Sequence, residues 1–346
     1  MLIKDMCSSI TDGSHNPPRG IESSPYLMLS SKNIFDDEIT LDEPRFLSEE
    51  DFEKENKRTN VKCGDVLLTI VGTIGRAAVV PNELPLFTLQ RSVAVLHPDE
   101  RFCSGRYLMY ALRGKRSYIE SRSKGVAQKG IYLKEVAEID LLVPSKETQE
   151  QIINTLDKVV SVIKCRQLEL KNLDDLIKSR FVELFGDCHI NDKGFESHKG
   201  SELFKFSSGK FLPEENRRDE GIPVYGGNGI AWYTDSSLVD YPTVIIGRVG
   251  AWCGNVHMVT EPVWITDNAI YIKEQKTNKF ALEFLTELMK VMDFHQYANF
   301  SGQPKITQKP LETLEYLIPP VEMQNEFTNF VKEVNKSKFT CIKSYI

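Results

Sequence analysis

The chain has 346 residues, a mass of 39.4 kDa and a formal net charge of −6. Its length suits two domains of roughly 150 residues, and its 41% hydrophobic and 27% charged residues exclude a collagen-like or wholly disordered protein. No apolar run approaches the ~20 residues that span a bilayer, and the start lacks a signal-peptide pattern, so we expect a cytoplasmic protein. Because the balance is acidic, any binding to nucleic acid must depend on local basic patches.

The first 146 residues are predicted to form one α+β domain. Short β-branched and apolar runs bounded by turn residues predict strands at Val66–Val71, Ala77–Val80 and Ser92–Leu96. Apolar residues at helical spacing follow at Gly105–Ser121. An apolar run that ends in proline, Ile139–Pro144, predicts a closing strand before the next element.

Residues 147–186 are predicted to form a long spacer helix. No proline or glycine interrupts Glu147–Phe185, and Gly186 stands where a C-terminal cap is expected, so the helix would be ~58 Å long. Its apolar residues alternate at spacings of four and three, as in a coiled-coil seam that only Arg166 and Arg180 interrupt. Such a helix is longer than a domain of ~150 residues usually contains, which favours a spacer over a core helix. The predicted seam contains Ile152, Leu156, Val159, Ile163, Leu170, Leu173, Ile177 and Leu184.

The second half of the chain repeats the plan of the first. Ile131–Ile152 matches Ile306–Phe327 without a gap at an offset of about 175 residues, and the same offset pairs Ile70–Gly75 with Ile245–Gly250. The repeat predicts a second α+β domain over residues 187–321 and a second, shorter helix over residues 322–346. The other predicted elements of this half are strands at Thr243–Ile246, Ala269–Ile272 and Glu315–Pro320, a helical stretch at Lys279–Tyr297, and seam residues Phe327, Val331 and Val334.

The predicted fold class is therefore α+β, with two repeated domains, each a twisted and mostly antiparallel sheet with helices. The two long helices are expected to pair as an antiparallel coiled coil. The second helix stops at Ile346, short of the point that matches Phe185. We therefore expect the end of the first helix, with Leu173, Ile177 and Leu184 and also Arg180, to remain unpaired and to contact another protein.

The sequence contains no motif that indicates catalysis. The seven cysteines include no CxxC pair, and neither Cys253 with His257 nor Cys188–His189 near His198 has zinc-finger spacing, so we expect no metal and no cofactor. The segment Asn16–Arg19 is similar to the NPP-aromatic motif of adenine methyltransferases, but Arg19 replaces the aromatic residue and no Gly-rich cofactor motif accompanies it. We interpret this segment as a turn. No ATP-binding loop or nuclease cluster is found, so no catalytic residue is predicted.

In their order and repetition these features resemble the DNA specificity subunit of Type I restriction-modification systems. The resemblance rests on an α+β domain, a closing strand with a PxxxxQ motif (Pro144–Gln149 and Pro319–Gln324), a long helix, and the repetition of all three. The segments Asp12–Pro18 and Ser31–Ile34 also resemble the start of a target-recognition domain.

The resemblance implies a non-catalytic subunit whose two target-recognition domains each read one half of a bipartite double-stranded DNA target. It also implies that the helices set the gap and that the chain docks methyltransferase subunits and, through them, restriction subunits. A stand-alone DNA-binding or scaffold protein with a coiled coil is the alternative. An enzyme with an unrecognised site is the least supported reading.

DNA recognition requires cationic and amide side chains on loops at the surface of the duplex. The run Arg113–Lys129 has six cations against one acid, Glu120, which predicts a positive patch, although a solvated helix face gives the same pattern. Tyr225–Gly229 fits a flexible DNA contact and a plain hairpin equally well. The predicted DNA-binding residues are His15, Arg19, Lys32, Thr73, Arg76, Arg91, Arg122, Lys124, Gln128 and Lys129 in the first domain, and Lys210, Tyr225, Asn228, Arg248, Trp252, Asn268, Gln303 and Lys305 in the second.

Overall fold

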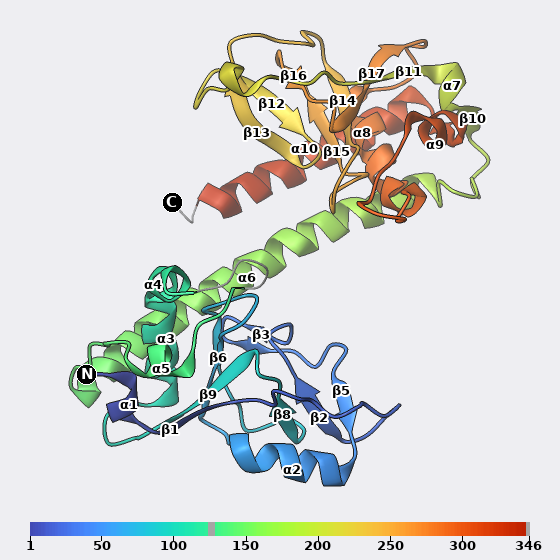
Figure 1. The fold of residues 1–346 in the computed structure, drawn as a ribbon. Helices are drawn as coiled ribbons and strands as arrows, with labels where there is room; N and C mark the ends of the chain where they lie inside the picture. The colour runs from blue at the N-terminus through green and yellow to red at the C-terminus, as the bar shows by residue number, and fades with distance from the viewer. Residues whose placement is uncertain (124–128, 344–346) are drawn as a thin grey trace. The chain divides into compact units, whose positions relative to one another are not determined.

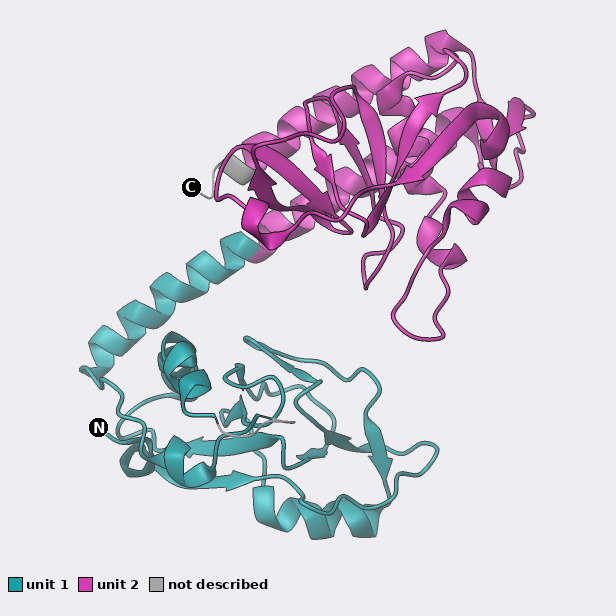
Figure 2. Cartoon of the chain, turned by 45° about the horizontal axis from the view of Figure 1, so that its top comes forward, with its two compact units in different colours: residues 1–163 teal, residues 164–346 magenta. Residues whose placement is uncertain are grey.

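The chain forms two compact units, Met1–Ile163 and Lys164–Ile346, in a computed structural model that describes residues 1–123 and 129–343 (Figure 2). Helix α6 (Lys146–Phe185) begins in the first unit and ends in the second (Figure 1). Among the described residues, no helix is both long and apolar enough to cross a membrane.

The first unit is built on two small sheets. A four-stranded antiparallel sheet has the order β1-β9-β6-β7, and a three-stranded mixed sheet has the order β5-β2-β8. In β6, Val66 and Leu68 face the core under the helices, whereas Leu67 faces the core shared with the second sheet, so this strand is buried on both faces. The elements are α1 (Ile3–Met6), β1 (Cys7–Asp12), β2 (Tyr26–Leu29), β3 (Ile34–Phe35), β4 (Glu38–Ile39), β5 (Arg45–Leu47), α2 (Glu49–Thr59), β6 (Val66–Thr69), β7 (Ala77–Val79), β8 (Phe87–Leu89), β9 (Val93–Pro98), α3 (Gly105–Gly114), α4 (Arg116–Ser121) and α5 (Leu133–Ala137).

The two larger sheets of the second unit have the same topology as those of the first, and the units differ in their two-stranded sheets, β3-β4 in the first and β10-β18 in the second. In the second unit the four-stranded sheet has the order β11-β17-β14-β15 and the three-stranded sheet the order β13-β12-β16, with β12 and β16 parallel like β2 and β8. The predicted duplication is therefore present in the strand connections as well as in the sequence. The elements are β10 (Glu196–Lys199), α7 (Gly200–Leu203), β11 (Phe204–Ser208), η1 (Glu214–Asn216), β12 (Ile222–Gly226), β13 (Gly229–Thr234), β14 (Thr243–Gly247), β15 (Val256–Val259), β16 (Trp264–Ile265), β17 (Ala269–Gln275), α8 (Leu282–Val291), η2 (Phe294–Tyr297), α9 (Gln308–Thr313), β18 (Glu315–Ile318) and α10 (Val321–Lys343).

Helix α10 packs antiparallel to the C-terminal part of α6, within the second unit. Arg180 pairs with Glu326 at 2.6 Å near the start of α10, and Asp174 pairs with Lys338 at 2.6 Å near its end. The rings of Phe181 and Phe327 lie edge to face, 5.6 Å apart, and both are fully buried. The predicted antiparallel pairing of the two helices is therefore confirmed.

The expectation that the end of α6 is unpaired is wrong. Ile177 is buried, Leu173 and Leu184 pack against the core of the second unit, and Arg180 is held by Glu326. The expectation rested on the length of the second helix alone. Although α10 is short, it covers the C-terminal end of α6, because it starts beside Arg180 and runs back along α6. Among the other seam residues, Ile152 and Leu156 pack on the first unit, Val159 is exposed, Ile163 and Leu170 are half-buried, and Phe327, Val331 and Val334 are buried.

Three predicted elements differ from those observed. The helical stretch Lys279–Tyr297 is divided into α8 and η2 at Asp293, which has a positive φ of 46°. The helical stretch Gly105–Ser121 is divided at Lys115, which leaves helical geometry with φ −101° and ψ 9°. The predicted strand Ile139–Pro144 is an extended segment in which Asp140 forms a single bridge with Leu2. Its counterpart β18 is a full strand because β10 supplies four paired residues. An extended segment becomes a strand only where a neighbour satisfies its backbone.

The PxxxxQ motif attaches each long helix to its own unit. The buried amide of Gln149 donates hydrogen bonds to the carbonyls of Pro144, at 3.0 Å, and Phe102, at 2.8 Å. In the second unit, the amide of Gln324 donates to the carbonyls of Pro319 (2.9 Å) and Lys279 (2.8 Å). Each glutamine therefore joins the first turn of its helix to the segment that leads into α3 or α8.

Candidate nucleic-acid interface

In each unit, five loops meet at one edge of the two sheets. They follow β1, β2, β6 and β8 and precede α5 in the first unit, and they follow the corresponding elements β11, β12, β14 and β16 and precede α9 in the second. Loops at such an edge are free to vary in sequence while the sheets hold their ends in place.

Backbone hydrogen bonds join the five loops of the first unit. Ser14 N donates to Leu89 O at 2.7 Å, and Arg91 N donates back to Ser14 O at 2.9 Å. Gly72 N donates to Lys129 O at 3.2 Å, while Ser31 N donates to the hydroxyl of Ser92 at 3.0 Å. These bonds bring the exposed side chains of His15, Lys32, Thr73, Arg91 and Lys129 to one face, with Arg76 half-buried beside them.

Three backbone bonds of the second unit have counterparts in the first, namely the bonds of Ser14 N and Gly72 N given above and the bond from Ile70 N to Ser92 O. Lys210 N donates to Ile265 O at 2.8 Å, Arg248 N donates to Asn268 O at 2.8 Å, and Gly250 N donates to Pro304 O at 2.9 Å. The side chain of Asn255 donates to that of Asn228 at 3.4 Å. The predicted residues Lys210, Tyr225, Asn228, Arg248, Trp252, Asn268, Gln303 and Lys305 all lie on these five loops or at their ends.

The hydrogen bonds correct one part of the sequence repeat. Thr69 and Gly247 end equivalent strands, because they face Val93 and Ala269 on the equivalent strands β9 and β17. Val71 forms a bridge with Gly130, and Val249 forms the matching bridge with Lys305. The loop Val71–Gly75 therefore corresponds to Val249–Gly254, and the predicted pairing of Ile70–Gly75 with Ile245–Gly250 is wrong. The offset that matches the closing strands does not apply here because loop lengths differ between the two halves.

Two glycines permit the close approach of the first loop to the sheet edge. A Cβ atom on Gly13 would collide with the carbonyl of Leu89, and one on Gly209 would collide with the carbonyl of Thr266. These glycines directly precede Ser14 and Lys210, whose amides bond to the neighbouring strand. The glycine is therefore needed in both halves to bring the loop after β1 or β11 onto the face.

The positive patch predicted at Arg113–Lys129 is partly neutralised. Arg116 pairs with Asp36 at 2.7 Å, and Arg113 lies 3.9 Å from the same carboxylate. Arg122 stacks over Tyr118 at 5.1 Å. Lys124 and Gln128 lie outside the described residues. Asp36 is distant in sequence, so the composition of the helix alone could not reveal this pairing.

The cations that remain lie around two hollows of the first unit. One hollow, of about 270 Å³, is lined by His15, Arg91 and Tyr132, among others. The other, of about 440 Å³, is lined by Thr73, Arg76 and Lys129 together with Arg116 and Glu120. Within the described part of the chain, Arg91 and Lys129 have no ion pair, so their charge is available to a phosphate or a base edge.

His15 belongs to a polar cluster at the mouth of the first hollow. Its Nε2 lies 2.8 Å from Oδ2 of Asp12, and Arg58 contacts the other carboxylate oxygen. The Asp12 side chain is only 9% exposed, whereas His15 is 51% exposed. The carboxylate therefore fixes the imidazole and leaves its outer edge open. Arg19 lies further along the same loop, next to Pro18, whose carbonyl accepts a hydrogen bond from Arg45 at 2.7 Å. Arg19 itself takes part in none of the bonds described above that join the five loops.

A hollow of the second unit that borders the loop after β14 has a volume of about 790 Å³. It lies between the loop after β14, helix α8 and the C-terminal part of α6, and Trp252, His257, Lys178, Lys290 and His295 line it. Burial lowers the pKa of His257, and the nearby charge of Lys290 lowers it further. His257 is therefore neutral at pH 7, and the two lysines of this hollow are balanced by Asp174 and Asp293, which also line it.

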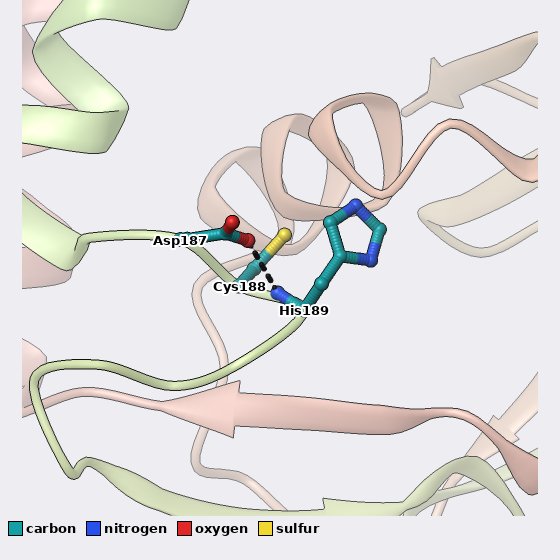
Figure 3. Close-up of side chains that lie close together, drawn as sticks. All are labelled: Asp187, Cys188 and His189. Carbon is teal, nitrogen blue, oxygen red and sulfur yellow. Dashed lines mark hydrogen bonds between the residues drawn. The ribbon is translucent and has the colours of Figure 1, made fainter.

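One group of residues with metal-ligating side chains forms a turn. Asp187, Cys188 and His189 are consecutive residues just after α6, and Asp187 accepts a hydrogen bond from the backbone N of His189 at 2.8 Å (Figure 3). Burial, with a contribution from Asp187, raises the pKa of Cys188 to about 11, which favours the neutral thiol over the metal-binding thiolate. His198 contacts Glu196 and Glu202. The geometry is that of a capped helix end.

Comparison with known proteins identifies the family. The sequence matches the family described as "Type I restriction modification DNA specificity domain" over residues 30–173 and again over residues 192–344. The chain belongs to this family. The two matched segments fall one in each half of the duplicated chain, which agrees with the repeated sheet topology.

Individual relatives agree with this assignment. The chain is 27% identical over 158 residues to the Type I restriction enzyme EcoprrI specificity subunit of Escherichia coli, covering 41% of this chain and 39% of that protein. It is 25% identical over 171 residues to the EcoBI specificity subunit, covering 49% and 35%. The matches thus span little more than a third of these relatives. The crystal structure of the S subunit from M. genitalium has the same fold, with a TM-score of 0.58 at 16% identity, covering 99% of this chain and 91% of that one.

The sequence analysis missed several residues of this face. Tyr132, which lines the hollow that contains Arg91, is 69% exposed, and Phe211, which directly follows Lys210, is 72% exposed. Asp267 lies between Thr266 and Asn268 at the turn that joins β16 to β17. The expected chemistry was that of cations and amides, so acidic residues were left out and only two aromatic residues, Tyr225 and Trp252, were included. Asp267 could have been found as the counterpart of Arg91 had the repeat been aligned by strands.

Proposed function

We propose that this chain is the non-catalytic specificity subunit of a Type I restriction-modification assembly, in which each half of the chain reads one half of a bipartite DNA target. In this proposal residues 1–146 and 187–321 are the target-recognition domains, and residues 147–186 and 322–346 are the spacer helices. The observation that carries it is the repeated five-loop face, with one scaffold in both units and different side chains on it. Membership of the DNA specificity family supports the same conclusion.

The chemistry of the two faces suits DNA. Exposed Arg, Lys, Asn and Gln side chains supply phosphate contacts and base contacts of the kind that position and specify a DNA-binding protein. In the first unit these include Arg91 and Lys129, and in the second Asn228, Gln303 and Lys305. An acidic chain with cations concentrated at these loops would direct the duplex to them.

The partners in this proposal are methyltransferase subunits, and restriction subunits that join through them. The middle of α6 supports it, because Val159 and Val162, which are three residues apart on one side of the helix, are 49% and 58% exposed, whereas the two ends of the helix are packed into cores. An apolar helical surface of this kind suits a partner subunit.

Methylation mapping tests the proposal directly. Host DNA would be sequenced for modified bases with the gene present, with it deleted, and with it restored. The expected result is a split sequence motif whose methylation disappears on deletion and returns on restoration. A purified chain that binds a defined split site alone at physiological salt, and whose deletion leaves methylation unchanged, would favour a stand-alone DNA-binding protein.

A second experiment tests the helix as a spacer. Seven residues of helical sequence inserted after Lys164 fall between Val160 and Leu173, outside the two cores that those residues contact. We expect the gap between the methylated half-sites to lengthen while both half-site sequences stay the same. A changed half-site with a constant gap would contradict the spacer role.

A further inference from the structure

Arg91 and Asp267 occupy the same structural position in the two units. Leu89 pairs with Leu29, and Ile265 pairs with Tyr225, in the two parallel strand pairs. Four residues later, Val93 and Ala269 face the equivalent Thr69 and Gly247. The turns Gln90–Ser92 and Thr266–Asn268 therefore match residue for residue.

The backbones of the two turns are held by the same bonds. Gln90 N donates to Leu29 O at 2.8 Å, as Thr266 N does to Tyr225 O at 2.9 Å. At the other end of the turn, Ser92 O accepts from Ile70 N at 2.9 Å, as Asn268 O does from Arg248 N at 2.8 Å. A turn fixed at both ends presents its middle residue in a defined direction, which is a requirement for reading a base.

Both middle side chains are exposed at the five-loop face. In the described part of the structure neither Arg91 nor Asp267 has an ion pair or a side-chain hydrogen bond to another residue. Arg91 lines the hollow that also contains His15. In the second unit, Arg248 donates to the backbone carbonyl of Asp267 at 3.0 Å, so its guanidinium lies beside the turn while the carboxylate stays unpaired.

The two side chains have opposite hydrogen-bonding character. An arginine only donates, and its fork matches the two acceptors on the major-groove edge of guanine. An ionised aspartate only accepts, and phosphates repel it, so on DNA its favourable partners are the amino groups on base edges, above all that of cytosine.

We propose that this turn residue is a paired specificity position, at which Arg91 reads a guanine in one half-site and Asp267 accepts from the amino group of a cytosine in the other. This inference rests on the proposed function and names the chemistry of the same face. It explains how one scaffold reads two different half-sites, because a single exchange at a fixed turn inverts donor and acceptor.

The experiment uses the full chain assembled with its methyltransferase subunit and a duplex carrying the motif found by methylation mapping. Affinity is measured for that duplex and for a set in which each base pair of both half-sites is replaced in turn. The variants are Arg91→Ala, Asp267→Ala and Asp267→Asn. Lys54→Ala and Glu261→Ala, at exposed positions outside the five loops, are controls matched in charge.

The wild-type chain is expected to reject the wrong base by about five- to 150-fold at one guanine of one half-site and one cytosine of the other. Arg91→Ala should abolish the first discrimination only, and Asp267→Ala the second only. Asp267→Asn should shift the second preference toward adenine, since an asparagine both donates to and accepts from that base.

The contrary result is a change in affinity that is the same for every duplex. If Asp267 meets no base, its removal relieves repulsion with phosphates and strengthens binding to every duplex equally. If Arg91 contacts only phosphate, its removal weakens binding to every duplex equally. Either pattern would overturn the inference while leaving the proposed function intact, whereas a wild-type assembly that does not prefer the mapped motif would overturn the proposed function.

Discussion

Replacing the buried Gln324 by alanine should destabilise the second unit far more than replacing an exposed residue of the same helix would. Gln324 is fully buried, and its amide makes three hydrogen bonds: to Lys279 O at 2.8 Å, to Pro319 O at 2.9 Å, and from Ala281 N at 2.9 Å. Truncation removes the partner of three backbone groups, one in a buried bond and two in part-buried bonds, at a cost of about 1–3 kcal/mol for each group that stays unsatisfied, and it opens a cavity. Since partial relaxation and water entry recover some of this, we expect a loss of about 3–5 kcal/mol.

Tryptophan fluorescence isolates this effect, because Trp232, Trp252 and Trp264 are the only tryptophans and all lie in the second unit. With a urea m-value of about 2 kcal/mol/M, the fluorescence-detected midpoint should fall by about 2 M. Gln149→Ala is the matched control, since it removes the equivalent side chain from the first unit, where two hydrogen bonds are lost. It should lower the midpoint measured by circular dichroism and leave the fluorescence midpoint nearly unchanged. An unchanged midpoint for Gln324→Ala, or an equal fall for both variants, would refute the reasoning.

Three further predictions follow from the described contacts. Because burial lowers the pKa of His257, the unfolded chain binds a proton at this residue more tightly than the folded chain does, so the second unit should lose stability as the pH falls below about 6.5. In urea titrations at pH 5 and pH 8, His257→Phe should weaken this pH dependence. Gly13→Ala forces a Cβ atom into the carbonyl of Leu89 and should abolish recognition of one half-site in binding assays, whereas Gly114→Ala, in open space, should not. If Lys129 contacts a phosphate, Lys129→Ala should reduce the slope of log affinity against log salt by about 0.9 without changing the preferred sequence.

The sequence alone determined the duplication, the long helices and the family. These features are periodic or local: a heptad pattern without proline or glycine predicts a helix, and a repeated PxxxxQ segment marks the same joint twice. The function of the PxxxxQ glutamine was not predictable, because its partners, such as Phe102 O and Lys279 O, lie about 45 residues away in sequence and meet it only in the fold.

Only the tertiary structure decided which side chains share a face and which charges remain unpaired. Asp36 neutralises Arg116 across a large sequence separation, and Asp267 becomes the counterpart of Arg91 only when strands rather than residue offsets are aligned. Loop lengths differ between the halves while the sheets keep their pairing, so no single offset preserves the correspondence. Backbone hydrogen bonds are specific to register, and they supply the alignment that side-chain similarity could not.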